Sequence, residues 1–306
     1  MRQFQGVITP LITPFRDDGA FYVQGMGNLI SFLAERGVHG VFAVGSYGQF
    51  PLMNVEERME VAEVVISEAK GHGMQVIVQV GSPGQKEALD LARHAAGAGA
   101  DAVASVVPFY YSHIGYDENV ILGHYQALVD SVDVPVHFYV NPTTTGYKLT
   151  VDTLSKLIDL GVMGIKDSGK DVVSFGENMN LVNRKRPEFD LMPGSASVLL
   201  AGMLLGADAC VAGTSAAFPE LVVECYDAVR AGDYQRAGLL QLKILEARRI
   251  QGGAGLRAAA CYDMLAMRGV DVGTSRRPWP RWGPEEKEVA KRQVAESQIP
   301  FSSIGG

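Results

Sequence analysis

Two apolar runs, Val136-His137-Phe138-Tyr139-Val140 and Val162-Met163-Gly164-Ile165-Lys166, lie on either side of an amphipathic stretch at 151–160. Short runs rich in Val are typical of strands that are buried on both faces of a parallel sheet. The same unit recurs along the whole chain. Further runs of this kind occupy residues 6–9, 40–44, 76–80, 102–106, 190–192 and 209–212. Apolar runs and helix-like stretches that alternate at roughly thirty-residue intervals predict parallel βαβ units.

Eight such runs predict an α/β fold, a (β/α)8 TIM barrel. Amphipathic stretches separate the runs, and candidate helix starts precede several of them, at Asn54 (with Glu57 as its capping-box partner), Asp117 and Thr150. A doubly wound open sheet is the alternative. Such a sheet would usually carry a GxGxxG turn after its first strand, whereas residues 10–14 here read Pro-Leu-Ile-Thr-Pro. The pattern therefore favours the barrel.

The predicted barrel spans residues 1–230, and residues 231–306 are expected to form a C-terminal three-helix extension. Helical stretches at 234–249, 254–267 and 284–297 make up this extension. The last two are separated by Arg276-Arg277-Pro278-Trp279-Pro280-Arg281-Trp282. We interpret this connection as a packed aromatic tether, with anion binding by its arginines as the alternative.

Composition excludes several classes of protein. The chain has 306 residues, with 27 Lys and Arg against 34 Asp and Glu, so its formal net charge is −7. Its pI is near 5.4. Nucleic-acid-binding domains usually carry a basic face, so we expect no nucleic-acid partner. No apolar run is long enough to span a bilayer, so we expect no membrane partner either.

The cysteines and histidines predict a cytoplasmic protein without a metal site. Cys210, Cys225 and Cys261 form no CxxC pair, so we expect free thiols in a reducing compartment. The prolines of Thr9-Pro10 and Thr13-Pro14 interrupt the apolar segment that a secretory signal would need. The histidines show no HxH or HxxxH pair, which argues against a metal-dependent aldolase.

Lys166 is the first candidate for catalysis, because it closes an apolar run that we assign to the sixth strand. In barrel enzymes the active site lies at the carboxyl ends of the strands. A lysine there can form a Schiff base, since a low-dielectric pocket lowers its pKa and frees the amine to attack a carbonyl. The alternative is a structural lysine paired with a neighbouring carboxylate such as Asp167.

Tyr139 ends the fifth predicted strand, so its phenol should lie over a neighbouring strand end and could shuttle protons. An aromatic that merely fills the barrel is the alternative. His137 points to the same side one layer deeper, and we interpret it as a core histidine. After the second run, residues 45–49 read Gly-Ser-Tyr-Gly-Gln, whose backbone N–H groups could bind an anion. Residues 108–111 form an aromatic cluster that could line a pocket or an interface.

In these motifs the chain resembles the dihydrodipicolinate synthase / N-acetylneuraminate lyase family of class I, Schiff-base pyruvate aldolases. Residues 45–49 are similar to the GTTGE or GSTGE loop of the family, and Pro108-Phe109-Tyr110 to its PYY segment. Residues 139–146 are similar to its YNxPxxTG segment, and residues 164–168 to its GxKDxS segment. The order and spacing of the motifs together are specific, and the resemblance covers nearly the whole chain.

The resemblance implies a lyase that needs no cofactor, because an imine between Lys166 and pyruvate or another 2-oxo acid serves as the electron sink. Tyr139 would be the proton shuttle, with Ser46 in the relay and Tyr110 reaching across a subunit interface. For the carboxylate, the resemblance implies the N–H groups of Ser46 and Tyr47, with Gly48 and Gly213 as further substrate-binding positions. It also implies a homotetramer or homodimer, and a 2-oxo acid and an aldehyde as small-molecule partners.

Three departures bear on specificity. Tyr47 and Gln49 replace the Thr and Glu of the family loop, and Thr144 stands where dihydrodipicolinate synthases have an Arg that recognises a second carboxylate. The loss of that Arg argues against dihydrodipicolinate synthesis. The order Tyr139-Val140-Asn141-Pro142 is similar to that of hydratase-aldolases that act on arylidene pyruvates, so Asn141 is a further candidate for specificity.

The leading hypothesis is a carbon–carbon lyase that cleaves or forms a bond between a 2-oxo acid and an aldehyde. A carbon–oxygen lyase is the alternative: a dehydratase or hydratase-aldolase that uses the same imine on a sugar acid or an arylidene pyruvate. A non-catalytic relative that binds a small carbonyl compound is an alternative of another class. The departures at Tyr47 and Gln49 keep this last hypothesis open, whereas Lys166 and Tyr139 argue against it.

Overall fold

A computed structural model of the chain describes residues 2–112, 116–253 and 255–301. His113, the predicted start of a helix at Ala254 and the end of the predicted extension at 302–306 lie outside the described residues.

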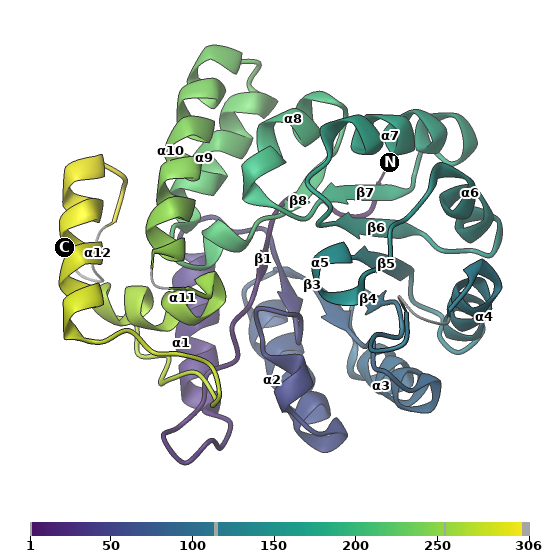
Figure 1. The fold of residues 1–306 in the computed structure, drawn as a ribbon, viewed down its shortest axis with the longest axis horizontal. Helices are drawn as coiled ribbons and strands as arrows, with labels where there is room; N and C mark the ends of the chain where they lie inside the picture. The colour runs from purple at the N-terminus through teal and green to yellow at the C-terminus, as the bar shows by residue number, and fades with distance from the viewer. Residues whose placement is uncertain (1, 113–115, 254, 302–306) are drawn as a thin grey trace.

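The strands form one parallel sheet that curves into a barrel, which confirms the predicted fold class (Figure 1). The order along the sheet is β7-β6-β5-β4-β3-β2-β1-β8, and every paired neighbour runs parallel. The strands are β1 (Gly6–Pro10), β2 (Gly40–Ala43), β3 (Gln75–Gln79), β4 (Ala102–Val106), β5 (Val136–Val140), β6 (Gly164–Asp167), β7 (Asp190–Pro193) and β8 (Ala209–Val211). Each of the eight predicted apolar runs therefore overlaps a strand, with bounds that differ by at most two residues.

Helices surround this barrel, as the amphipathic stretches predict (Figure 1). They are α1 (Val23–Ala34), α2 (Val55–Gly71), α3 (Gln85–Ala98), α4 (Glu118–Val129), α6 (Val151–Asp159), α7 (Val172–Lys185), α8 (Leu199–Leu204) and α9 (Pro219–Arg230). Asn54 and Glu57 form the expected capping box, and Asp117 and Thr150 also cap their helices. A short helix, α5 (Pro142–Thr145), follows β5 and was not predicted.

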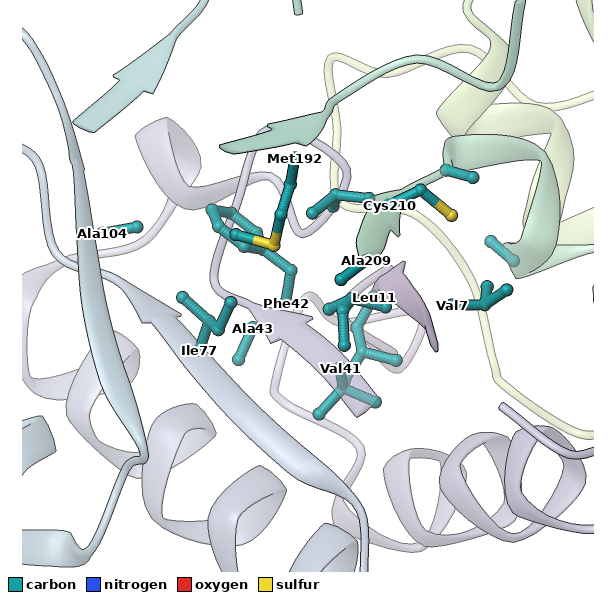
Figure 2. Packing of buried hydrophobic residues seen from close by; sticks show 14 of the residues in the cluster. Val7, Leu11, Val41, Phe42, Ala43, Ile77, Ala104, Met192, Ala209 and Cys210 are labelled. Atoms are coloured by element: carbon teal, nitrogen blue, oxygen red, sulfur yellow. The ribbon is translucent and has the colours of Figure 1, made fainter. Parts of the chain in front are cut away.

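Apolar side chains fill the barrel interior. Figure 2 shows Met192 of β7 and Phe42 of β2 pointing into the same interior, with Leu11 and Ile77 nearby. Each of these side chains is at most 2% exposed. The interior is thus a packed core, so any reactive pocket has to lie at the strand ends.

The C-terminal helices are α10 (Tyr234–Gly252), α11 (Arg257–Met267) and α12 (Pro284–Ser297), and they lie together at one side of the barrel (Figure 1). Helix α10 packs against α9, so the extension continues the outer layer. A separate unit beginning at residue 231 remains a prediction. Among the described residues, no helix is long and apolar enough to cross a membrane.

The connection at 276–282 is a tether, as interpreted from the sequence. The guanidinium of Arg276 binds Glu57 and the carbonyls of Gly19 and Leu52, and it lies over the Phe15 ring at 4.3 Å. Trp282 is only 8% exposed. Because Arg276 is already paired, it is not an anion site.

Candidate active site

The sheet register brings the two main candidates together. Tyr139 of β5 and Lys166 of β6 are directly paired positions of adjacent parallel strands. Side chains at paired positions of a parallel ladder point to the same face. Both residues lie near the carboxyl ends of their strands, where barrel enzymes carry their chemistry.

The ε-amine of Lys166 lies between two aromatic rings. Nζ is 3.6 Å from the centroid of the Phe42 ring and 3.9 Å from that of Tyr139. The residue is 3% exposed, and burial lowers its pKa below 10.5, although Tyr139 acts in the opposite direction. Asp167 does not pair with it: that carboxylate accepts the N–H of Gly169 at 2.7 Å. The geometry thus favours a reactive amine over a structural ion pair.

The Tyr139 phenol is the centre of a small polar network. Its oxygen lies 3.3 Å from Ser46 Oγ, and Asn141 Nδ2 donates to both oxygens, at 3.3 and 3.4 Å. Burial acts to raise the pKa of Tyr139, but the charge of Lys166 and hydrogen bonds with Ser46, Lys166 and Ser168 hold it below 10.0. A phenol with a lowered pKa beside an amine can pass protons to and from a bound carbonyl compound.

The loop after β2 offers free backbone donors next to this network. Within the described residues, the N–H groups of Ser46, Tyr47 and Gly48 donate to no other group. The turn begins at Val44, whose φ is +53°, an uncommon and strained value for a β-branched residue. Successive N–H groups without a partner in a tight turn can bind a carboxylate.

Tyr47 and Gly213 are matched in shape. A Cβ on Gly213, two residues after the end of β8, would overlap the Tyr47 hydroxyl and ring, so any larger residue there would displace the Tyr47 side chain. Burial of the phenol raises the pKa of Tyr47 well above 10.0, so the hydroxyl stays protonated. Tyr47 thus forms part of the pocket wall, and its hydroxyl takes a different position from that of a short threonine.

Gln49 and Gly48 do not line the pocket. The Gln49 side chain is fully buried: Nε2 donates to the Arg276 carbonyl at 2.9 Å, and Oε1 accepts from Arg276 N–H and Tyr262 hydroxyl. Gln49 therefore has no direct contact with the pocket through which it could act on specificity, which is the role that the sequence led us to expect. At Gly48 a Cβ would crowd Thr13, whose hydroxyl donates to the Gly48 carbonyl. Both residues hold the loop in shape.

The pocket above Lys166 has a volume of about 210 Å³. Asn141 and Thr144 form one side, and Tyr47 and Gly213 form another. The C-terminal extension supplies further lining residues, among them Arg248, Leu256, Arg257 and Trp279. Thr144 donates its hydroxyl to the Asn141 carbonyl at 3.3 Å, so this position presents no cation to the pocket.

Tyr110 lies away from this pocket. It is 71% exposed with φ +81°, and its ring packs edge-on against Tyr111, whose centroid is 4.9 Å away. A role for Tyr110 in catalysis would need a second subunit that brings it to another site. Of the cluster at 108–111, Tyr110 and Tyr111 are exposed on the surface of the single chain, whereas Phe109 packs edge-on against Phe50, and none of the four lines this pocket.

His137 lies in the core, as interpreted from the alternation. It is fully buried beneath the site, with its ring edge-on to Phe4 and 3.7 Å from Asp190, and burial lowers its pKa to about 3. Among the described residues, no group of three His, Cys, Asp or Glu side chains is arranged to hold a metal ion.

Sequence reasoning missed the groups that reach the pocket from a distance. Phe42 looks like any apolar strand residue, and Arg248 and Arg257 look like ordinary polar positions of surface helices. Only the three-dimensional return of the chain places the two arginines beside residues of β5 and β6. The alternation of β2 could have identified Phe42 as an inward side chain, but not as the neighbour of an amine.

Comparison with known proteins agrees with this geometry. The Dihydrodipicolinate synthetase family profile matches residues 3–297. An uncharacterized DapA-like lyase of Halobacterium salinarum is 34% identical over 95% of this chain and 93% of its own length. The probable 2-dehydro-3-deoxy-D-pentonate aldolase YjhH of Escherichia coli is 35% identical over 80% of this chain and 81% of its own. A crystal structure of YagE from E. coli K12, a dihydrodipicolinic acid synthase family protein in complex with pyruvate, has a TM-score of 0.91 at 27% identity, with 97% and 100% of the two chains covered.

The fold and these relatives together define a lyase of the class I aldolase type, acting on carbon–carbon or carbon–oxygen bonds. The chain belongs to the dihydrodipicolinate synthetase family, as its motifs predict.

Proposed function

We propose that this chain is a Schiff-base aldolase that joins pyruvate, or a related 2-oxo acid, to an aldehyde and cleaves the product. The observation that carries the proposal is the ε-amine of Lys166, enclosed by the rings of Phe42 and Tyr139 at the base of a pocket. A desolvated amine with a lowered pKa is the nucleophile that imine formation needs.

The proposed cleavage begins when the amine of Lys166 adds to the C2 carbonyl of the substrate and water leaves, giving an iminium ion. A base takes the proton from the C4 hydroxyl, and the C3–C4 bond breaks. Its electron pair moves toward the iminium nitrogen, and the aldehyde departs. The enamine then takes a proton at C3, and water releases pyruvate and the free amine. The iminium is the electron sink, so the proposal requires no cofactor or metal.

Tyr139 is the proposed proton carrier in these steps. Its phenol lies beside Lys166 and is bonded to Ser46, and Asn141 donates to both. The N–H groups of Ser46 and Tyr47 are the proposed site of the 2-oxo acid carboxylate, because they donate to no other group in the described residues and both residues line the pocket. Uncharged donors of this kind hold an anion without placing another cation beside the amine.

The aldehyde half is proposed to differ from that of dihydrodipicolinate synthases. Thr144 lines the pocket with a neutral hydroxyl at the position of the family Arg. The relative YjhH is named as a probable aldolase of a 2-dehydro-3-deoxy sugar acid. A sugar acid of this type is therefore our first candidate substrate for cleavage.

A dehydratase or hydratase-aldolase is the second candidate, because it uses the same imine. Asn141 favours it: its amide hydrogen-bonds Tyr139 and Ser46, where it could orient a leaving hydroxyl or an attacking water. Trp279 and Leu256, which line the same pocket, suit an apolar or aromatic substrate. A non-catalytic binder is the weaker hypothesis. Gln49, one of the two departures that favoured it, does not line the pocket.

Product analysis tests the function. The purified chain is incubated with a panel of 2-keto-3-deoxy sugar acids and with an arylidene pyruvate, and pyruvate and aldehyde are quantified. The proposal predicts equal amounts of pyruvate and aldehyde from at least one substrate, and none with Lys166→Met. A product that keeps every carbon and has lost water would identify a dehydratase. If no substrate is turned over and pyruvate condenses with no aldehyde, both the aldolase and the dehydratase proposals are contradicted.

We also propose that the chain assembles as a homodimer or homotetramer in the cytoplasm. Tyr110 and Tyr111 are an exposed aromatic pair, and exposed leucines, Leu239, Leu242 and Leu245, recur along α10. Apolar groups of this kind often mark an interface. The three described cysteines are free and buried, as suits a reducing compartment. Size-exclusion chromatography with light scattering would give the mass of the assembly, and the mass of a monomer would contradict the proposal.

A further inference from the structure

Three cationic side chains lie together at the mouth of the pocket. Lys170 follows β6, Arg248 lies in the last turns of α10, and Arg257 begins α11. All three line the same pocket as Lys166. We call Lys170, Arg248 and Arg257 the cation cluster.

None of the three side chains has a carboxylate partner in the described part of the chain. Lys170, Arg248 and Arg257 make no ion pair there and donate no side-chain hydrogen bond. By contrast, Arg36, Arg268 and Arg276 each pair with a glutamate. Lys170 is exposed and the two arginines are partly buried, and like charges that line one pocket repel one another, so a bound anion would stabilise the cluster.

The surroundings of the cluster increase the cost of this repulsion. Arg248 is partly buried, and burial and the neighbouring Arg257 act to lower its pKa. Burial and both arginines do the same to Lys170. The chain as a whole carries a net charge of −7, so the cluster is a local reversal of sign. A local positive field inside a pocket attracts and orients an anion there, whatever the charge of the whole molecule.

The pocket leaves room for a second charged group. The free N–H groups of Ser46 and Tyr47 are on the β2 side and take one carboxylate in the proposed function. The cluster lies on the wall formed by the loop after β6 and by the C-terminal helices. A substrate attached to Lys166 therefore meets two anion-binding regions, one for each half of the molecule.

We propose that the cation cluster binds an anionic group, a phosphate or a carboxylate, on the aldehyde half of the substrate. This inference rests on the proposed function. Arg248 and Arg257 supply guanidinium groups, whose planar donors match the oxygens of either anion. Leu256 and Trp279 line the same pocket and add apolar surface beside the two arginines. In this proposal the C-terminal extension recognises the anionic group, whereas dihydrodipicolinate synthases use an Arg at the position of Thr144.

The test compares aldol addition of pyruvate to three aldehydes: glyceraldehyde, glyceraldehyde 3-phosphate and succinic semialdehyde. Wild type is compared with Arg248→Gln, Arg257→Gln and the charge-keeping Arg248→Lys. The neighbouring Arg249→Gln is the matched control, because Arg249 is exposed and does not line the pocket. Borohydride trapping of the pyruvate imine is run on every variant.

The expected result is a preference of wild type for one anionic aldehyde over glyceraldehyde, and the preferred one distinguishes phosphate from carboxylate. Each Gln variant should reduce the ratio of kcat/KM for the anionic over the neutral aldehyde by about 10- to 100-fold, with partial recovery in Arg248→Lys. Arg249→Gln should keep the wild-type ratio, and the imine should form in every variant.

Three outcomes would overturn the inference. In the first, the ratio in the Gln variants is unchanged or both aldehydes lose equally, which would mean a structural role. In the second, wild type forms the imine but prefers glyceraldehyde or uses neither anionic aldehyde. Both leave the proposed function standing. In the third, wild type forms no imine, and the proposed function then fails together with this inference.

Discussion

The amine of Lys166 has an environment unlike that of a surface lysine, since it is enclosed by Phe42 and Tyr139 and has no carboxylate beside it. Burial disfavours its charged form, so the neutral amine should exist at lower pH than in water. We expect acetic anhydride labelling of Lys166, followed by mass spectrometry at a series of pH values, to give a midpoint below 10.5. A midpoint at or above 10.5 would contradict this expectation.

The phenol of Tyr139 should matter for proton transfer and not for imine formation. Tyr139→Phe keeps the ring beside Lys166 but removes the oxygen bonded to Ser46 and Asn141. We expect kcat to fall by about 10²- to 10⁴-fold, the usual contribution of a positioned proton donor. Pyruvate should still be trapped on Lys166.

The matched control for this change is Tyr147→Phe, which removes a phenol outside the pocket and should leave kcat close to wild type. Equal losses in both variants would indicate a general effect on folding. Loss of the trapped imine in Tyr139→Phe would mean that the phenol acts earlier than we propose.

At the scale of elements, the segment after β8 packs against the loop after β2, because Gly213 leaves space for the Tyr47 ring. Gly213→Ala would drive a methyl group into the Tyr47 ring and displace that loop. We expect KM for pyruvate to rise about 10-fold or more, since a small shift of positioning groups is costly. In a Tyr47→Ala background the same Gly213→Ala change should raise KM much less, because the ring that the methyl group would displace is absent. Independent, additive losses would show that the two residues do not act on each other.

The elements themselves were largely predictable from the sequence. Val-rich runs mark the strands because both faces of a parallel sheet are buried, and Asn54, Asp117 and Thr150 mark helix starts because they cap free N–H groups. The short helix α5 escaped prediction, since four residues show no period. The placement of Lys166 beside Tyr139 was predictable, because the ends of neighbouring strands lie together in a barrel.

The rest of the site depends on contacts between distant parts of the whole molecule. Gln49 was expected to face the substrate from its place in a family loop, yet it bonds Arg276, which is 227 positions away. No local pattern reports such a contact. The same return of the chain brings Arg248, Arg257 and Trp279 over the strand ends, so the C-terminal extension completes the pocket rather than only covering the barrel.

This contact predicts that Gln49 stabilises the fold without touching substrate. Gln49→Ala would leave the N–H of Arg276 without its partner, whereas the Arg276 carbonyl would still accept the N–H of Trp279. We expect a loss of about 1–3 kcal/mol in the free energy of unfolding, which is the usual cost of one donor left without a partner. Urea denaturation would measure it. Near-wild-type KM values for the folded variant would agree with this account, and wild-type stability with altered substrate preference would contradict it.

The central claim is that Lys166 forms an imine with a 2-oxo acid. The most direct measurement is borohydride reduction in the presence of pyruvate, followed by intact mass and peptide mapping, with Lys170→Met as a control that keeps the buried amine. We predict one reduced pyruvate adduct, located on Lys166, in wild type and Lys170→Met, and none in Lys166→Met. A folded wild-type protein with no adduct from pyruvate or from longer 2-oxo acids, or an adduct on another lysine, would contradict the claim.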